Sequence, residues 1–176
     1  MIESNMIVAI SSGTTPQLIA NYITDVKNVT FVTNSIPVAM ALLKRIDTGE
    51  VSGQVIISGG KIDGENLITT SDTAIEEIDR FNFNLAFVSC TAMSGKGASS
   101  FYIHGIPFFK HIMKQSLSSV LVAESAKMGK VSTYTYAKLT DFDTIITDNK
   151  NPIPKDIAES ISNSKTKITI AECNNN

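Results

Sequence analysis

The chain has 176 residues, 43% of them hydrophobic, and a formal net charge of −2 at pH 7. This length and composition suit a folded domain with its own core and exclude an intrinsically disordered chain. The slight negative charge, with no run of Lys or Arg longer than Lys44-Arg45, argues against nucleic-acid binding by this segment itself.

The first two predicted elements are a strand and a helix joined by a polar turn. Residues 6–10 form an apolar run typical of a buried strand, and apolar residues recur over 18–23 at the spacing of one helical face. In the turn 12–16 (Ser-Gly-Thr-Thr-Pro), Gly13 permits a tight bend, and Thr15 before Pro16 is typical of a helix start. The amides and dipole at such a start bind anions, although an ordinary capped turn explains the pattern equally well.

The later segments alternate between strand-like and helix-like patterns. Short apolar runs predict further strands over 29–33, 54–58, 85–90, 119–123, 144–147 and 167–171. Periodic segments predict helices over 34–45, 72–80, 108–116 and 155–163. The stretch 61–70 is polar and carries no predicted element, and the small, polar stretch 91–100 predicts a loop. We expect a single domain over 1–173 and a frayed tail at 174–176.

The predicted strands are nearly all apolar instead of alternating between apolar and polar residues. This pattern indicates a mostly parallel sheet covered on both faces by helices, a Rossmann-like three-layer α/β fold. Ligands of such sheets bind beyond the carboxyl ends of the strands, where loops lead into helices. The polar loop segments that this rule places on one rim are 11–15, 33–35, 58–60, 89–97 and 124–130.

Taken together, several of these segments resemble the effector-sensing domain of DeoR-family transcriptional repressors. The matching segments are 12–15 (Ser-Gly-Thr-Thr), 32–35 (Val-Thr-Asn-Ser), 57–60 (Ile-Ser-Gly-Gly), 123–129 (Ala-Glu-Ser-Ala-Lys-Met-Gly) and 139–148 (Leu-Thr-Asp-Phe-Asp-Thr-Ile-Ile-Thr-Asp). The resemblance implies a fold similar to the phosphosugar isomerase and CoA-transferase superfold. It also implies a regulator that binds a phosphorylated sugar or a related anionic metabolite, without a cofactor, and that assembles into a homo-oligomer.

The resemblance further implies a DNA-binding partner segment. Family members usually carry an N-terminal winged helix-turn-helix, and residues 1–3 (Met-Ile-Glu) look like the last turn of a helix that precedes the first strand of the family. We therefore expect the parent protein to bind DNA through an N-terminal domain missing from this sequence.

The rim and the resemblance together predict an effector site. Lys127 would neutralise the anionic group of the effector, and Asn34 and Ser35 would offer an amide and a hydroxyl to the sugar. Simpler roles stay open, because Asn34 and Ser35 could only cap a helix, the two glycines could serve a turn, and Lys127 could be solvated. The full set of predicted effector-binding residues is Ser11, Ser12, Gly13, Thr14, Thr15, Thr33, Asn34, Ser35, Gly59, Gly60 and Lys127.

The chain departs from the family pattern where the family has acidic residues. Ser11 stands where the family usually has Asp, Glu124 replaces another Asp, and the segments 89–93 and 103–109 lack the expected acidic groups. Carboxylates are preferred acceptors for sugar hydroxyls. The phosphate half of the predicted site is therefore better preserved than its sugar half.

Two other functions remain open on the sequence. A sugar-phosphate isomerase would need a carboxylate base near the substrate, and the rim offers few candidates. A degenerate oligomerisation domain without a ligand is the second alternative. The aromatic segments 101–102 and 106–109 are a candidate oligomer contact. His104 and His111 lack partners at metal-ligand spacing, so no metal site is expected.

Location follows from weaker signals. No apolar run approaches the length of a membrane span, and the first residues do not resemble a signal peptide. A disulfide between Cys90 and Cys173 is poorly supported, because Cys90 ends an apolar run and Cys173 lies in a polar tail. We expect a cytoplasmic protein with no membrane partner.

Overall fold

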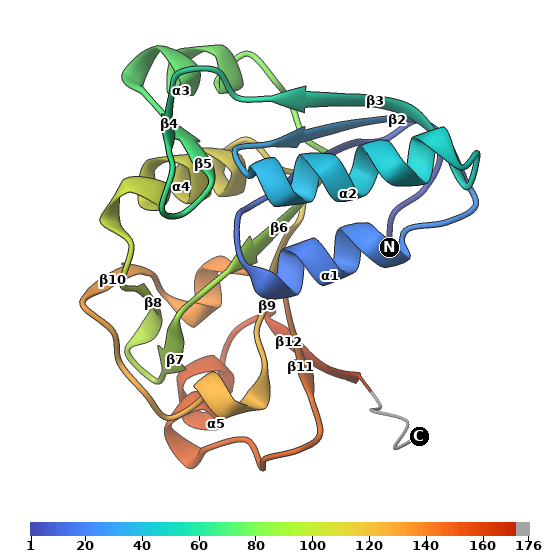
Figure 1. Ribbon diagram of the computed structural model, residues 1–176. Coiled ribbons are helices and arrows are strands. Elements are labelled where there is room, and N and C mark those ends of the chain that lie inside the picture. The colour runs from blue at the N-terminus through green and yellow to red at the C-terminus, as the bar shows by residue number, and fades with distance from the viewer. Residues whose placement is uncertain (172–176) are drawn as a thin grey trace.

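A seven-stranded parallel sheet forms the centre of the molecule (Figure 1). The computed structural model describes residues 1–171, with the backbone alone for 72–74, so the predicted frayed tail lies outside the described residues. The strands lie in the order β12-β11-β9-β6-β1-β2-β3, and each neighbouring pair is parallel. Their bounds are β1 Ile7–Ile10, β2 Val26–Thr33, β3 Val51–Ile57, β6 Leu85–Ser89, β9 Ser119–Val122, β11 Thr144–Asp148 and β12 Lys167–Ala171.

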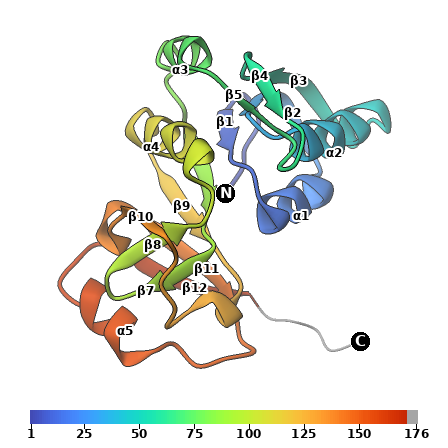
Figure 2. The ribbon, with the colours of Figure 1, turned by 60° about the vertical axis from the view of Figure 1, so that its left-hand side comes forward.

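Helices lie on both sides of this sheet (Figures 1 and 2). The strands alternate between two hydrophobic cores: Val8 and Ile10 belong to the core beneath α1 and α2, and Ala9 belongs to the core beneath α4 and α5. Burial on both faces explains why the strands are apolar throughout, and it confirms the predicted three-layer α/β class. The helices are α1 Thr14–Tyr22, α2 Ile36–Asp47, α3 Asp72–Ile78, α4 Ile106–Lys114 and α5 Lys155–Ile161. None of the described helices has the length and apolar character that crossing a bilayer requires.

The loop predicted over 91–100 is wrong. This stretch forms β7 (Ala92–Ser94) and β8 (Gly97–Ser100), which join β10 (Tyr134–Ala137) in a small antiparallel sheet. Its small residues permit close approach of the backbones, because a Cβ on Gly97 would lie 2.2 Å from the carbonyl oxygen of Ala137. Pairing with a distant strand therefore overrides the low strand propensity of glycine, alanine and serine.

A second short hairpin occupies the polar stretch 61–70, where no element was predicted. β4 (Lys61–Asp63) pairs with β5 (Ile68–Thr70) in antiparallel register. The hairpin is fixed to the end of β2, since the Thr69 amide donates to the Asn34 carbonyl at 2.8 Å and the Ile36 amide donates to the Leu67 carbonyl at 2.9 Å. It therefore extends over the carboxyl edge of the central sheet.

The two helices that follow β1 and β2 begin differently. Gly13, and not Thr15, is the N-cap of α1, and no side chain caps this helix. The hydroxyl of Thr15 is buried without a hydrogen-bond partner in the described protein, so the predicted capping role of Thr15 is wrong. Ser35 does cap α2, because its side chain accepts from the Val38 amide. The first amides of α1 are consequently left without an intrahelical or side-chain acceptor.

Candidate functional site

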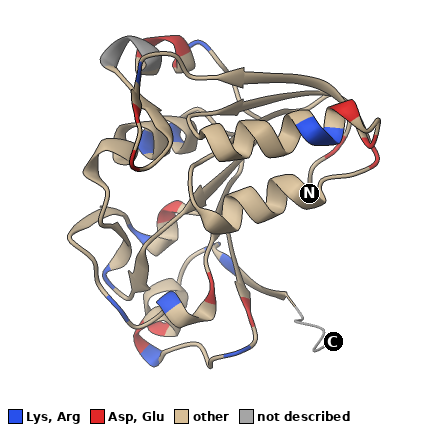
Figure 3. Cartoon of the chain, viewed as in Figure 1, with Lys and Arg blue, Asp and Glu red and all other residues tan. Residues whose placement is uncertain are grey.

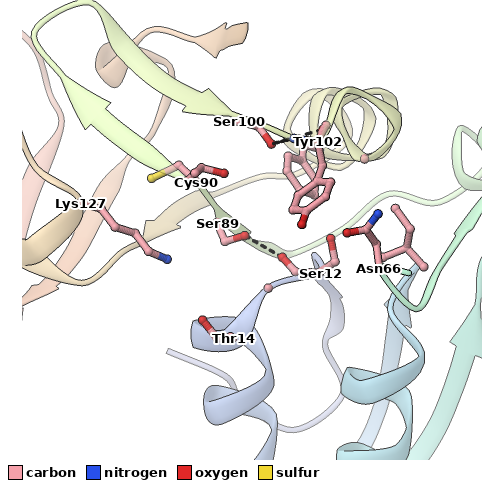
Figure 4. Close-up of a pocket in the computed structure, with 13 residues that line it drawn as sticks. Ser12, Thr14, Asn66, Ser89, Cys90, Ser100, Tyr102 and Lys127 are labelled. Carbon is pink, nitrogen blue, oxygen red and sulfur yellow. Dashed lines mark hydrogen bonds between the residues drawn. The ribbon is translucent and has the colours of Figure 1, made fainter. Parts of the chain in front are cut away.

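A cavity of about 280 Å³ opens at the carboxyl ends of β1 and β6, the central strands of the sheet (Figure 4). The chain runs outward from β1 through β2 and β3 on one side, and outward through β6 and β9 on the other, so this edge is where ligands of such sheets bind. The residues that line it are Ser12, Gly13, Thr14, Asn66, Ile68, Ser89, Cys90, Thr91, Ser100, Tyr102, Gly105, Phe109 and Lys127.

The floor of the cavity is a tight connection between the ends of β1 and β6. The Ser89 amide donates to the Ser11 hydroxyl at 3.1 Å, and the Ser89 hydroxyl donates to the Ser12 carbonyl at 2.6 Å. Gly13 has a φ of +131°, and a Cβ on it would lie 2.6 Å from the Ser89 hydroxyl. The buried Tyr136 hydroxyl in turn donates to the Ser89 carbonyl at 2.7 Å. These contacts hold the start of α1 against the cavity.

Lys127 reaches the cavity from a single-turn 3-10 helix, η2 (Ser125–Lys127), that follows β9. Asp148, at the end of β11, fixes this turn: its carboxylate accepts from the Ser125 amide at 2.9 Å and from the Ser125 hydroxyl at 2.6 Å. The Asn151 side chain also donates to the Ser125 hydroxyl. The hydrogen bond from the Ser125 hydroxyl is the main reason that the pKa of Asp148 is lowered to about 2.

Replacing Asp148 with asparagine is expected to lower stability at neutral pH. The native pKa of Asp148 lies below the usual carboxyl value of 3.8, so its contribution is fully present above about pH 4 and is lost as the pH falls toward 2. The difference in urea midpoint between wild type and Asp148→Asn should therefore be largest at neutral pH and shrink toward pH 2. Asp47→Asn, at an exposed position, serves as the control. A difference that is independent of pH would contradict this role.

The charge at the cavity depends on the residues that line it, because the chain as a whole is nearly neutral. Acidic and basic residues are interspersed along the chain (Figure 3), and the 15 basic residues nearly balance the 17 acidic ones. Among the described residues that line the cavity, Lys127 alone carries a charge. Burial raises the pKa of the Cys90 thiol to about 12, so this thiol is protonated and a poor nucleophile at neutral pH.

The structure brings together four of the predicted effector-binding residues: Ser12, Gly13, Thr14 and Lys127 line the cavity. Ser11 and Thr15 flank this group but are not part of the lining; Ser11 is fully buried and links β1 to β6.

The other five predicted residues lie outside the lining. Thr33 accepts a hydrogen bond from the Ser35 amide, and Ser35 caps α2. Asn34 is 1% exposed, and neither polar atom of its side chain has a partner in the described protein. Gly60, with a φ of +111°, and its neighbour Gly59 form the turn between β3 and β4. The simpler roles therefore explain two of these residues: Ser35 is a helix cap and Gly60 is a turn residue.

Sequence reasoning missed the upper wall of the cavity. Asn66 and Ile68 come from the unpredicted hairpin, and Tyr102 and Phe109 come from the aromatic segment interpreted as an interface. Phe109 is buried, whereas Phe101 is 63% exposed, so only part of that segment is free for contacts. The signal that could have found Asn66 is the turn sequence 63–66 (Asp-Gly-Glu-Asn), which is typical of a hairpin.

Residues 1–149 match the family described as the DeoR C terminal sensor domain. The chain belongs to this family. Regulators of transcription are among its relatives in sequence. The chain is 30% identical over 126 residues to an uncharacterized HTH-type transcriptional regulator of Staphylococcus epidermidis, and the match covers 72% of the chain and 49% of the relative. It is also 30% identical over 151 residues to the HTH-type transcriptional regulator IolR of Bacillus subtilis, covering 83% and 57%.

A third relative of the sensor domain is the glycerol-3-phosphate regulon repressor of Escherichia coli, at 22% identity, covering 86% of the chain and 59% of the relative. The chain thus spans about half the length of the curated relatives that it matches. Among solved structures, it is similar to ribose 5-phosphate isomerase A of Methanocaldococcus jannaschii, with a TM-score of 0.45 and 11% identity over 73% of the chain and 48% of that structure. The sequence relatives named above are transcriptional regulators or repressors.

Proposed function

We propose that this sensor domain binds a small phosphorylated metabolite in the cavity between β1 and β6, and that binding changes the DNA affinity of a cytoplasmic repressor of which it is a part. The observation that carries the proposal is the convergence of the α1 start and Lys127 on one cavity. Uncapped helix amides and a half-buried ammonium group are a suitable pair for a phosphate group.

The composition of the cavity supports a sensor more than an enzyme. Proton transfer at a sugar carbon requires a base, and no carboxylate or imidazole is among the described residues that line the cavity. The protonated thiol of Cys90 cannot substitute for one. A site with anion-binding groups and no base can hold a phosphorylated compound without converting it.

The position of the cavity suggests how binding could be transmitted. One wall follows β1 and the other comes from the turn after β9, on opposite sides of β6 in the sheet. A phosphate held by both walls favours the conformation in which they are closest, which is the differential affinity that regulation requires. Self-association, expected from the family resemblance, would pass this change between copies.

Thermal denaturation with a panel of sugar phosphates and glycerol phosphate, each beside its unphosphorylated counterpart, tests the proposal. At a ligand concentration of about 100 times Kd, mass action adds about 2.7 kcal/mol of stability, which raises Tm by roughly 5–10 °C for a domain of this size. The phosphorylated compounds should raise Tm and their counterparts should not. Turnover of any of these compounds, or an equal response to both members of each pair, would contradict the proposal.

A further inference from the structure

The β4–β5 hairpin places a neutral hydrogen-bonding group at the opposite end of the cavity from Lys127 (Figure 4). It is anchored by the bonds of Thr69 and Leu67 to the end of β2 and by a bridge between Ser35 and Ile68. Ile68 and Asn66 therefore reach the cavity from a fixed support, and Asn66 is the polar member of the pair.

Asp63 determines which atom of the Asn66 amide is free. One oxygen of the Asp63 carboxylate accepts from the backbone amides of Glu65 and Asn66, at 3.0 and 3.3 Å. The other accepts from the side-chain nitrogen of Asn66 at 2.7 Å. A carboxylate only accepts hydrogen bonds, so an amide turned the other way would bring two oxygens together. Asp63 thus holds the nitrogen and leaves the oxygen of Asn66 for the cavity.

The figure agrees with this orientation. In Figure 4 the amide oxygen of Asn66 points toward Ser12 and Tyr102, and the nitrogen points away from them. The hydrogen bond from the Asn66 side chain is the main cause of the lowered pKa of Asp63, so this carboxylate stays ionised throughout the physiological range. The cavity therefore presents a fixed acceptor, and a ligand must supply a donor to it.

The surroundings of Asn66 decide which kind of donor fits. Ile68, Tyr102 and Phe109 add apolar and aromatic surface to this end of the cavity, and no carboxylate belongs to its described lining. A ligand ammonium group would be desolvated here, and the neighbouring Asp63 carboxylate is outside the lining and already accepts three hydrogen bonds, so a direct ion pair with it is not available. A hydroxyl group can donate to the Asn66 oxygen without bringing a charge.

We propose that Asn66, held in one orientation by Asp63, determines specificity by accepting a hydrogen bond from a hydroxyl group of the ligand. The ligand class is then a hydroxylated organic phosphate that carries no ammonium group. This inference rests on the proposed function, because it assumes that the phosphate lies at the Lys127 end. Asp63 is a positioning residue, since it acts through Asn66.

Two phosphates that differ only in their hydroxyl groups test the inference. Glycerol phosphate and n-propyl phosphate have the same carbon number and charge, so calorimetric titration of the whole chain with each isolates the contribution of the hydroxyls. We expect wild type to bind glycerol phosphate about tenfold more tightly than propyl phosphate, because propyl phosphate leaves the Asn66 oxygen without a hydrogen-bond donor. Asn66→Leu should remove this preference, so that the two phosphates bind with similar affinity. Asn21→Leu, an exposed asparagine on α1, is the matched control.

Asp63→Ala separates positioning from folding. It should reduce the preference for glycerol phosphate while the affinity for propyl phosphate stays at the wild-type value, which a general loss of structure would not do. Asn66→Ala replaces Asn66→Leu if the larger side chain lowers Tm. In a second pair, ethylene glycol monophosphate should bind more tightly than phosphoethanolamine, because only the latter carries an ammonium group.

The possible failures are distinguishable. Equal affinity of wild type for glycerol and propyl phosphate, or an unchanged preference in both Asn66 variants, would overturn the role of Asn66 and leave the proposed function standing. Tighter binding of phosphoethanolamine would overturn the ligand class. Absence of binding for every phosphate would overturn this inference and the proposed function together.

Discussion

Lys127→Ala is expected to weaken binding of a phosphorylated ligand by about thirtyfold. Removing a charged hydrogen-bond partner costs about 2 kcal/mol, and Lys127 is the one charged group in the described lining of the cavity. Lys127→Arg should retain part of the affinity, since the charge remains but its geometry changes. Calorimetric titration with glycerol phosphate measures both variants.

The matched control for this prediction is Lys96→Ala, an exposed lysine outside the lining of the cavity. Both alanine variants change the net charge of the chain equally, so a long-range charge effect would act on both. Equal affinities of Lys127→Ala and wild type would remove Lys127 from the site. Equal losses in the two alanine variants would show that net charge, and not a contact, is responsible.

Gly13→Ala is expected to destabilise the domain by about 2–6 kcal/mol. Its φ of +131° with a ψ of 160° lies in a region that is almost restricted to glycine, and a Cβ there would meet the Ser89 hydroxyl at 2.6 Å. Backbone strain and overpacking each cost about 1–3 kcal/mol. The urea midpoint of Gly13→Ala should therefore fall sharply relative to wild type.

A double variant separates the two causes. In Gly13→Ala with Ser89→Ala the steric contact is reduced and the backbone strain remains, so the combined loss should be smaller than the sum of the single losses. Gly64→Ala is the control, because nothing lies within 4 Å of its added Cβ, and it should change stability by less than about 0.5 kcal/mol. Additive losses for Gly13 and Ser89 would contradict the predicted contact.

Elements that carry a buried apolar run could be predicted from the sequence. The strands of the central sheet were found this way, because a strand covered on both faces has few alternatives to apolar residues. The placement of the segments 11–15 and 124–130 at one edge followed from the same reasoning, since the carboxyl ends of parallel strands share one edge. The choice of Lys127 within the second segment came from the family resemblance. Physical pattern and fold geometry were therefore sufficient for the central strands and for the shared edge.

The rest depends on contacts that no local pattern encodes. β7 and β8 consist of glycine, alanine, serine and one methionine, and they form strands because β10 pairs with β8. Tyr102 and Asn66 reach the cavity only because the hairpin and the segment before α4 fold over the sheet edge. The Thr15 cap was wrong because Gly13 adopts a conformation that begins the helix earlier.

Titration of the amide resonances with glycerol phosphate tests the central claim most directly. If the α1 start and Lys127 form one anion site, the largest saturable shifts should fall on Ser12, Gly13, Thr14 and Lys127 together. Residues of the α1–α2 surface such as Tyr22 and Met40, both exposed, should stay unchanged. Shifts centred on that surface, or at the α1 start without Lys127, would contradict the account.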